Sequence, residues 1–176
     1  MKTEEKIAAR IRDVNDFPVK GVVFKDITPV LKDMELFNEI TDVFARRYKD
    51  AKIDKVAGIE SRGFIFGMPL AVKMGIPFVP IRKKGKLPAE TVSVSYTLEY
   101  GTAAIEIHKD AVLKGERVLI VDDLLATGGT TNAAVELVGK LEGEAAAAAF
   151  AIELSFLNGR ENIKNKKLDV FSILKY

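Results

Sequence analysis

The sequence predicts an α/β fold in which a mostly parallel central sheet is flanked by helices on both faces. Continuously apolar runs, such as 118–121, alternate with segments that have apolar residues at helical spacing, such as 130–143. Strands and helices that alternate in this way form βαβ units, and runs without polar residues indicate strands buried on both faces. A length of 176 residues suits a single domain, 1–176, with a sizeable core.

The helices follow from apolar spacing and from residues that start or stop them. Ile7 and Ile11 lie on one face of a short helix in "TEEKIAARIRDV". Asp33 can cap the next helix, and Gly75 is placed to end the helix in "GFIFGMPLAVKMG". A further helix, "TTNAAVELVGKLEG", is expected later in the sequence and stops near Gly143.

Five segments are expected to form the strands of the central sheet. The alanines at 145–149 favour a helix by intrinsic propensity. Their position after a strand and a helix, and the continuation through Phe150 and Ile152, favour a strand instead. The five predicted strands are "KVAGIES", "FVPIR", "RVLIVDD", "AAAAAFAIEL" and "VFSIL".

The segment 82–108 has a different pattern. It opens with the basic loop "KKGKLPAE", after which apolar and polar residues alternate with a period of two. Ile105 and Ile107, for example, alternate with Glu106 and His108. This pattern predicts a two-stranded antiparallel ribbon that is exposed on one face and lies outside the central sheet.

Composition excludes several classes of function. The net charge is only +2, from 27 basic and 25 acidic side chains, so a nucleic-acid partner is not expected. There is no cysteine, which excludes disulfides and thiolate chemistry. The charged N-terminal stretch does not resemble a signal peptide, and no apolar run reaches the ~20 residues that span a membrane. We therefore expect a cytoplasmic protein that does not bind membranes.

The stretch "VLIVDDLLATGGTT", 118–131, contains the clearest chemical signal. Gly128 and Gly129 allow a ligand to approach the backbone, and the N–H groups of 126–131 lead into a helix N-terminus, which favours an anion. Hydroxyl groups add further donors. We call 126–131 the phosphate loop; its residues are Ala126, Thr127, Gly128, Gly129, Thr130 and Thr131.

Two acidic residues precede the phosphate loop. Asp122 and Asp123 would repel a phosphate, but carboxylates can accept hydrogen bonds from the vicinal hydroxyls of a sugar. A site for a phosphate next to a site for two neighbouring hydroxyl groups fits a ribose 5-phosphate. The lysine of a P-loop and the glycine spacing of a dinucleotide-binding loop are both missing. The alternative is an ordinary strand–helix turn with two chance acidic residues.

This stretch resembles the phosphoribosyl pyrophosphate (PRPP) binding motif of type I phosphoribosyltransferases. The sequence is similar, over nearly its whole length, to the adenine phosphoribosyltransferases of that family. The resemblance implies a type I phosphoribosyltransferase fold with a small N-terminal hood, 1–33, that binds the base, and a flexible lid at 82–108. The matching stretches are "FPVKGVVFKDITPVL", "GIESRGFIFG", "IRKKGKLP", "SYTLEYG" and "IELSFLNGR".

The resemblance also implies an activity. Members of the family act in purine salvage, transferring the 5-phosphoribosyl group from PRPP to adenine to give AMP and pyrophosphate. Mg²⁺ is the cofactor and is carried mainly by PRPP, so no metal site made only of protein ligands is expected. The family is usually homodimeric.

The resemblance implies that four residues recognise the base. In the family, backbone groups around Val23 and Lys25 bond the adenine edge, Phe24 stacks on the ring, and Leu154 covers its other face. Some relatives have arginine in place of Lys25, which matters only if the side chain braces the site. From composition alone, Val23, Phe24 and Leu154 would be ordinary core residues.

The resemblance also implies that two segments recognise pyrophosphate. Ser61 and Arg62 resemble the family's pyrophosphate loop, in which the Glu60–Ser61 peptide is strained or cis. In the family, one side chain of the basic loop reaches the neighbouring subunit's site. Without the resemblance, this loop would be read as a solvated charged surface. Its candidate residues are Arg82, Lys83, Lys84 and Lys86.

Glu99 is the candidate for proton transfer, with Tyr100 beside it, because the matching glutamate of the family approaches the purine's five-membered ring. The alternative is a solvated hairpin residue. His108, the only histidine, is not expected to be a base or a metal ligand. Two other functions remain open: a phosphoribosyltransferase for another purine base, and a non-catalytic regulator that senses PRPP.

Overall fold

In a computed structural model, which describes residues 1–98 and 101–176, the protein forms an α/β domain around a seven-stranded sheet. The strand order in the described residues is β5-β6-β4-β3-β7-β8-β9. The helices are α1 (Thr3–Arg10), α2 (Thr28–Leu31), α3 (Met34–Tyr48), α4 (Arg62–Met74), α5 (Gly129–Lys140) and α6 (Gly159–Asn162), with a 3₁₀ turn, η1, at Ser155–Leu157. The strands are β1 (Arg12–Asn15), β2 (Val23–Asp26), β3 (Lys55–Ile59), β4 (Phe78–Lys83), β5 (Thr91–Leu98), β6 (Gly101–His108), β7 (Arg117–Leu125), β8 (Glu144–Glu153) and β9 (Asp169–Lys175).

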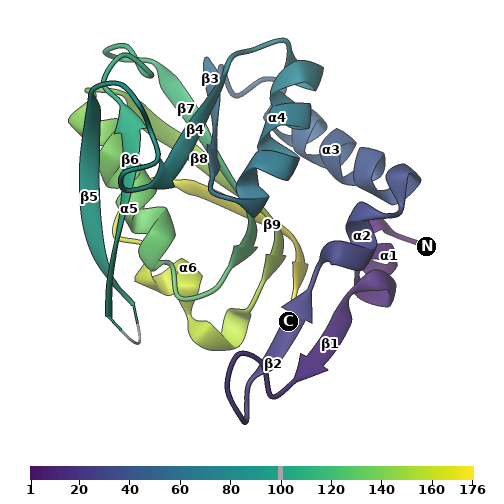
Figure 1. Cartoon of the computed structure of the whole chain (residues 1–176). Coiled ribbons are helices and arrows are strands. Elements are labelled where there is room, and N and C mark those ends of the chain that lie inside the picture. The colour runs from purple at the N-terminus through teal and green to yellow at the C-terminus, as the bar shows by residue number, and fades with distance from the viewer. Residues whose placement is uncertain (99–100) are drawn as a thin grey trace.

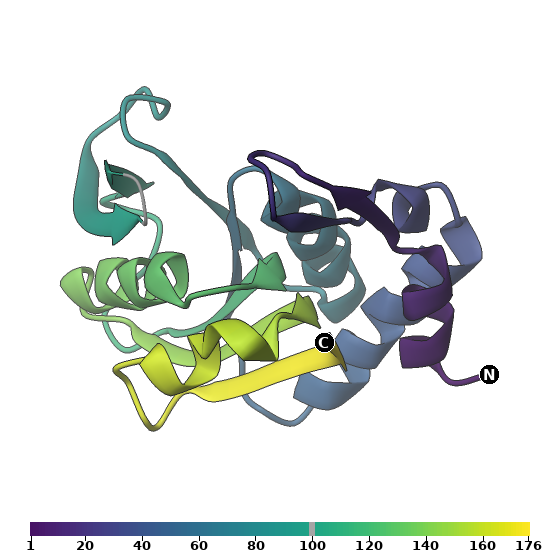
Figure 2. The same cartoon turned by 90° about the horizontal axis from the view of Figure 1, so that it is seen from below.

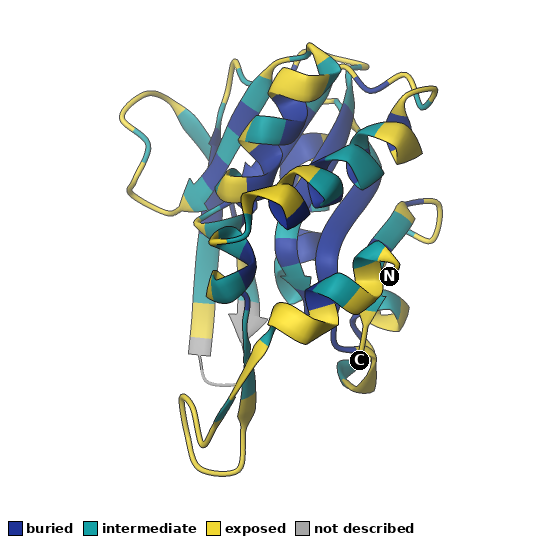
Figure 3. Ribbon diagram, turned by 90° about the vertical axis from the view of Figure 1, so that its right-hand side faces the viewer, coloured by how far each residue is buried: buried dark blue, intermediate teal, exposed yellow. Residues whose placement is uncertain are grey.

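The sheet is mostly parallel and is covered on both faces, as predicted. Strands β4, β3, β7, β8 and β9 pair in parallel. On one face, α1, α3 and α4 bury a cluster that includes Phe44 and Phe66, while on the other α5 buries Leu137 and its neighbours. Figure 3 shows the result: strands and inward helix faces are buried, and outward helix faces are exposed.

Local signals located the ends of two helices correctly, but the first helix is shorter than predicted. It ends at Arg10, and the residues expected to continue it enter β1, because pairing with β2 replaces the helix there. The Asp33 side chain accepts a hydrogen bond from the Leu36 N–H and caps α3. Gly75 ends α4 in the left-handed conformation, with φ of 67°. The alanine-rich segment is strand β8, whose residues Ala148 and Ala149 are fully buried between neighbouring strands. Burial on both faces therefore overrides the helical propensity of alanine here.

The expectation that the ribbon lies outside the central sheet is wrong. Strand β6 pairs antiparallel with β4, so that Arg82 lies opposite Glu106 and the ribbon extends the sheet at its edge. Glu106 and His108, expected on the exposed face, are buried and half-buried. The physical reason is that β4 offers an unpaired edge, and the loop between β4 and β5 folds over the Glu106 carboxylate.

The N-terminal hood contains a small antiparallel sheet of β1 and β2, together with α1 and α2 (Figure 2). The alternation in these two short strands was too brief to predict them from the sequence. Among the residues that the structure describes, no helix combines the length and the apolar character needed to cross a bilayer.

Candidate active site

The candidate site lies where two neighbouring parallel strands end. Strands β3 and β7 are paired, with Gly58 opposite Val121, so the segments that follow them meet at one edge of the sheet. The segment after β3 carries Ser61 and Arg62, and the end of β7 carries the two aspartates. Ligands of open α/β sheets bind at such carboxyl edges.

Two adjoining cavities occupy this edge. The larger, about 280 Å³, is lined by both aspartates, by Lys83 and by the segment 60–62. The smaller, about 70 Å³, is lined by Asp122 and by 124–131, which includes the whole phosphate loop. Asp122 is the residue that lines both cavities.

The phosphate loop leads into the start of α5. Gly128 has φ of 84°, a conformation that favours glycine, and it occupies the N-cap position of the helix. The first N–H groups of a helix lack partners within the helix, and they carry the positive end of its dipole. The structure thus brings together the loop residues that the sequence singled out as phosphate donors.

The two aspartates have different surroundings. Asp123 is 5% exposed and accepts a hydrogen bond from Arg62 Nε at 2.5 Å. Asp122 accepts the N–H of Asp123 at 2.9 Å, and burial together with the neighbouring Asp123 carboxylate raises its pKa well above the ordinary value. One carboxylate is therefore paired with a cation, whereas the other, buried beside a like charge, holds its proton more readily than an ordinary aspartate.

The basic residues are divided between the cavity and the loop. Ser61, Arg62 and Lys83 line the larger cavity. Arg82 instead donates to the Glu60 carboxylate at 3.2 and 3.3 Å and to the Lys86 carbonyl oxygen at 3.0 Å. The structure therefore does not bring the guanidinium of Arg82 or the exposed Lys86 into the cavity with the others.

Glu60 is a residue that sequence analysis did not select. It accepts two hydrogen bonds from Arg82 and one from the Lys83 N–H, and the bonds from Arg82 hold its pKa below the ordinary value. The peptide between Glu60 and Ser61 is cis. The signal available in the sequence was an acidic residue immediately before the pyrophosphate-loop match.

The base-binding candidates lie where the hood meets the C-terminal edge of the sheet. Lys25 donates to Asp13 at 2.8 Å, and its ammonium lies 4.3 Å from the centre of the Tyr176 ring. The Tyr176 backbone bonds both Glu153 and Ser155, which flank Leu154. Strand β2 is thereby fastened beside the residue expected to cover the base.

The exposure of the base-binding candidates differs. Val23 is 47% exposed and Phe24 is half-buried, with its ring edge-on to Phe17 at 5.2 Å. Leu154 is 9% exposed. Glu99 and Tyr100 lie outside the described residues, between the two strands of the ribbon.

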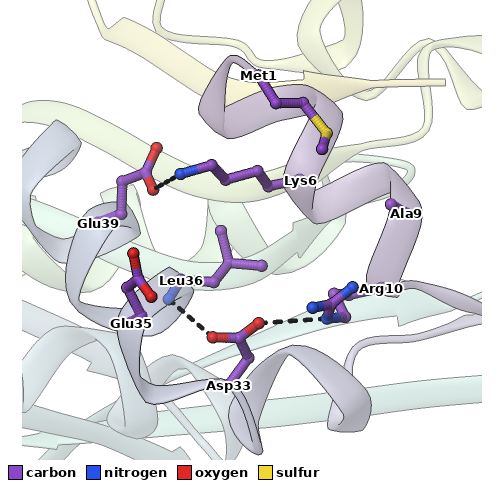
Figure 4. A pocket seen from close by; sticks show the side chains of 8 residues that line it. All are labelled: Met1, Lys6, Ala9, Arg10, Asp33, Glu35, Leu36 and Glu39. Atoms are coloured by element: carbon purple, nitrogen blue, oxygen red, sulfur yellow. Dashed lines mark hydrogen bonds and ion pairs between the residues drawn. The ribbon is translucent and has the colours of Figure 1, made fainter.

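A separate hollow of about 210 Å³ lies between α1 and α3, outside the predicted site. Figure 4 shows that its charged side chains face one another: Lys6 pairs with Glu39, and Arg10 pairs with the helix-capping Asp33. These ion pairs join the two helices, and none of the sequence-predicted site residues lines the hollow.

The fold and this site define a phosphoribosyltransferase, and residues 27–175 match the family described as the phosphoribosyl transferase domain. The sequence is 56% identical to an adenine phosphoribosyltransferase of Halothermothrix orenii over 165 residues, which cover 94% of this protein and 96% of that one. The protein therefore belongs to the adenine phosphoribosyltransferase family.

Solved structures of the family have the same fold. The crystal structure of adenine phosphoribosyltransferase from Thermoanaerobacter pseudethanolicus is 53% identical, with a TM-score of 0.93 over 98% of this protein and 99% of that one. The Saccharomyces cerevisiae protein, crystallised with an imino-altritol bisphosphate and adenine, is 39% identical, with a TM-score of 0.91 and 98% of both proteins covered.

Proposed function

We propose that the protein transfers the 5-phosphoribosyl group of PRPP to adenine, giving AMP and pyrophosphate in purine salvage. The observation that carries this proposal is the pair of adjoining cavities that share Asp122. The smaller cavity suits the 5′-phosphate, the shared carboxyl group suits the ribose hydroxyls, and the larger cavity with its cations suits the diphosphate. Their order along the edge is the order of these groups in PRPP.

The reaction is a displacement at the anomeric carbon of the ribose. The bond from this carbon to the pyrophosphate oxygen breaks as the bond to the purine nitrogen forms, and positive charge develops on the sugar. Arg62 and Lys83 would stabilise the negative charge that gathers on the departing pyrophosphate. Alignment of two bound substrates supplies a further part of the rate enhancement.

Arg62 would link recognition of the sugar to recognition of the leaving group. Its Nε bonds Asp123, while its residue lines the cavity assigned to pyrophosphate. The remaining N–H groups of a guanidinium can donate to a phosphate oxygen at the same time. An Arg62 held by the buried Asp123 is thus oriented before PRPP arrives, which reduces the entropy lost on binding.

Adenine recognition would use the backbone of β2. A carbonyl oxygen and an N–H group of the backbone around Val23 and Lys25 match the amino donor and ring-nitrogen acceptor of adenine, whereas a 6-oxo purine reverses that order. An unpaired buried polar group costs about 1–3 kcal/mol, which is enough to discriminate between the bases. Phe24 and Leu154 would sandwich the ring.

Glu99 and Tyr100 are proposed to complete the site from the lid. Glu99 would exchange a proton with the purine ring as the new bond forms, with Tyr100 beside it. Closure of the ribbon would exclude water, which protects PRPP from hydrolysis.

Mg²⁺ is proposed to enter with PRPP. The carboxyl groups of Asp122 and Asp123 are oxygen donors of the kind this ion prefers, but Asp123 is already paired with Arg62. The ion would therefore be held mainly by diphosphate and ribose oxygens, and it would neutralise charge on the leaving group when bound. A cytoplasmic location, without nucleic-acid or membrane partners, fits this reaction of small soluble substrates.

A homodimer is also proposed, and the outer face of α4 supports it. Ile65, Met68 and Val72 lie on one side of this helix and are 39%, 49% and 68% exposed. A second copy of the protein could cover this apolar stripe. Because α4 begins at Arg62, such a partner would lie near the pyrophosphate cavity, within reach of a basic loop residue.

One assay tests the proposed function. The protein is incubated with PRPP and Mg²⁺ and with adenine, hypoxanthine or guanine in turn, and pyrophosphate release is measured. We expect turnover with adenine and at least tenfold less with the 6-oxo purines. Equal or faster turnover with another purine would change the assigned base. PRPP binding without turnover of any base would indicate a regulator instead of an enzyme.

A further inference from the structure

The segment after β8, residues 154–164, runs along the back of the phosphate loop, and we call it the strap. Both views of the fold place its helix α6 beside the N-terminal end of α5 (Figures 1 and 2). The proposed function assigns no role to this segment beyond Leu154. It nevertheless packs against the phosphate loop and is hydrogen-bonded to it.

The first contact is backbone against backbone at two glycines. A Cβ atom on Gly128 would lie 2.5 Å from the carbonyl oxygen of Gly159. A Cβ atom on Gly159 would overlap the carbonyl oxygen of Ala126. Neither position can accept a side chain unless the two backbone segments separate, so the strap sets how far back the phosphate loop can lie.

The second contact is a series of hydrogen bonds. Asn162 Nδ2 donates to the Thr127 carbonyl oxygen at 3.1 Å. Asn132, in the first turn of α5, donates to the Asn162 carbonyl oxygen at 2.9 Å and accepts the Lys164 N–H at 2.9 Å. The strap therefore holds the phosphate loop on both sides of its glycines.

The strap is itself anchored in the interior. Arg160 donates to both oxygens of Glu153, which is 4% exposed, and to the Val170 carbonyl oxygen in β9. Ser172 donates to the same carboxylate at 2.7 Å. A bidentate pair with an additional donor fixes Arg160, and with it the neighbouring Gly159, relative to the sheet.

We propose that the strap positions the phosphate loop for the 5′-phosphate of PRPP, with Gly159 and Asn162 as its positioning residues. This inference rests on the proposed function. Backbone donors bind an anion well only if they point at one place before the ligand arrives. The strap supplies that order from behind the loop and leaves the donor side free.

The test compares strap variants with matched controls in the full-length protein. Asn162→Ala removes one donor at an exposed position, and Gly159→Ala forces the two backbone segments apart. The controls are Asn38→Ala, on exposed helix surface of α3, and Gly139→Ala, where a Cβ atom meets nothing within 4 Å. Dissociation constants for ribose 5-phosphate and for pyrophosphate with Mg²⁺ are measured by calorimetry, together with KM values and the melting temperature.

For Asn162→Ala we expect weaker ribose 5-phosphate binding and a higher KM for PRPP, by about 3- to 10-fold. For Gly159→Ala, the dissociation constant for ribose 5-phosphate and the KM for PRPP should both rise more than tenfold. Pyrophosphate affinity and the KM for adenine should stay within about twofold, because those ligands are bound elsewhere. Asn162→Asp should weaken ribose 5-phosphate further than Asn162→Ala does, since a carboxylate cannot donate to Thr127 and repels the phosphate.

Two results would overturn the inference. One is an unchanged ribose 5-phosphate affinity in both Asn162 variants. The other is an equal weakening of binding for ribose 5-phosphate, pyrophosphate, PRPP and adenine, together with a lower melting temperature. That combination is what a purely structural role gives. Failure of the proposed function would look different, because the unaltered protein would then release no pyrophosphate from PRPP in the presence of adenine.

Discussion

The phosphate loop is held between buried elements, whereas the hood that carries most of the base-binding candidates is built on two short strands. Thr131 is 3% exposed, and the strap that backs the loop is fixed by the buried Glu153. In the hood, Phe17 and Val19 are 51% and 54% exposed. A two-stranded sheet alone is only marginally stable, so the hood depends on its side-chain pairs.

Under the proposed function, this difference leads us to expect that the two substrates are recognised in physically different ways. The groups assigned to the ribose 5-phosphate moiety are held in place by buried contacts, so little conformational entropy should be lost when it binds. The exposed apolar side chains of the hood, by contrast, would be covered only when a base packs on them. Substitutions at the two ends should therefore separate in kinetics and in stability.

The largest effect is expected at Arg62. Arg62→Ala removes a cation from the proposed pyrophosphate site and leaves the buried Asp123 without its partner. We expect kcat/KM for PRPP to fall by about 10²–10³-fold, as when a single preorganised donor is lost from a site where negative charge develops. Steady-state kinetics at saturating adenine measure this change.

Arg62→Lys serves as a graded comparison, since it keeps the charge but not the planar donor, and it should recover part of the loss. Arg46→Ala, at an exposed position of α3, is the control and should change kcat/KM by less than twofold. Retention of more than a tenth of the activity by Arg62→Ala would remove this residue from the proposed mechanism.

The second effect concerns stability at the phosphate end. Glu153→Gln removes the charge that holds Arg160 and leaves a cation partly buried, so we expect a loss of about 2 kcal/mol. For a protein of this length that corresponds to a fall in Tm of roughly 4–8 °C. Thermal unfolding followed by circular dichroism measures the shift.

The matched control is Glu90→Gln, which removes one partner of the exposed Lys109–Glu90 pair. Surface pairs contribute about 0–1 kcal/mol, so Tm should change little. Equal effects of the two substitutions would contradict the contrast between a buried anchor and a solvated pair.

Asp26 provides a pH test that is confined to the hood. Hydrogen bonds from Arg12, followed by those from Thr28, lower the pKa of Asp26 from 3.8 to about 2. Because the folded pKa lies below the unfolded one, this contribution to hood stability is fully present above about pH 4. It is lost as the pH falls from about 4 to 2.

Hydrogen exchange of backbone amides in β1, β2 and α5, corrected for the intrinsic rate at each pH, measures this loss. Protection of β1 and β2 should fall across that window while α5 keeps its protection. Asp26→Asn should make hood protection lower and nearly independent of pH there. Parallel loss in α5 would show that the hood and the phosphate end unfold as one unit.

Sequence reasoning succeeded where a few adjacent residues determine the structure. Asp33 and Gly75 mark helix ends through their own chemistry, and the run from Asp122 to Thr131 forms the predicted passage from a buried strand into a helix. It failed where the partner is distant in the sequence. Arg82 was expected to face pyrophosphate, but Glu60, 22 residues earlier, pairs with it.

The same limit explains the ribbon and the strap. A period of two shows that one face of β6 is polar, but not that a loop covers Glu106 with N–H donors from Lys86 and Leu87. Gly159 looks like any loop glycine until the fold places Ala126 against it. Glu99 and Tyr100 remain predictions, as do the roles of the residues that bind the base.

The smallest effect is expected at Lys25. Its ammonium bonds Asp13 and lies over the Tyr176 ring, so the side chain fastens β2 to the sheet edge instead of facing the cavities. Lys25→Arg keeps both interactions, because a guanidinium also pairs with carboxylates and stacks on aromatic rings. The KM for adenine should therefore change by less than about twofold.

Lys25→Met keeps most of the aliphatic part of the residue but loses the charge, and it should raise the KM for adenine by about 3- to 5-fold while the KM for PRPP stays constant. Initial rates with each substrate varied in turn measure both constants. A change of the same size in the KM for PRPP would mean that the hood also orders the phosphate loop. The reason is that a local loss of contacts at β2 would otherwise leave the loop, which the strap supports, unaffected.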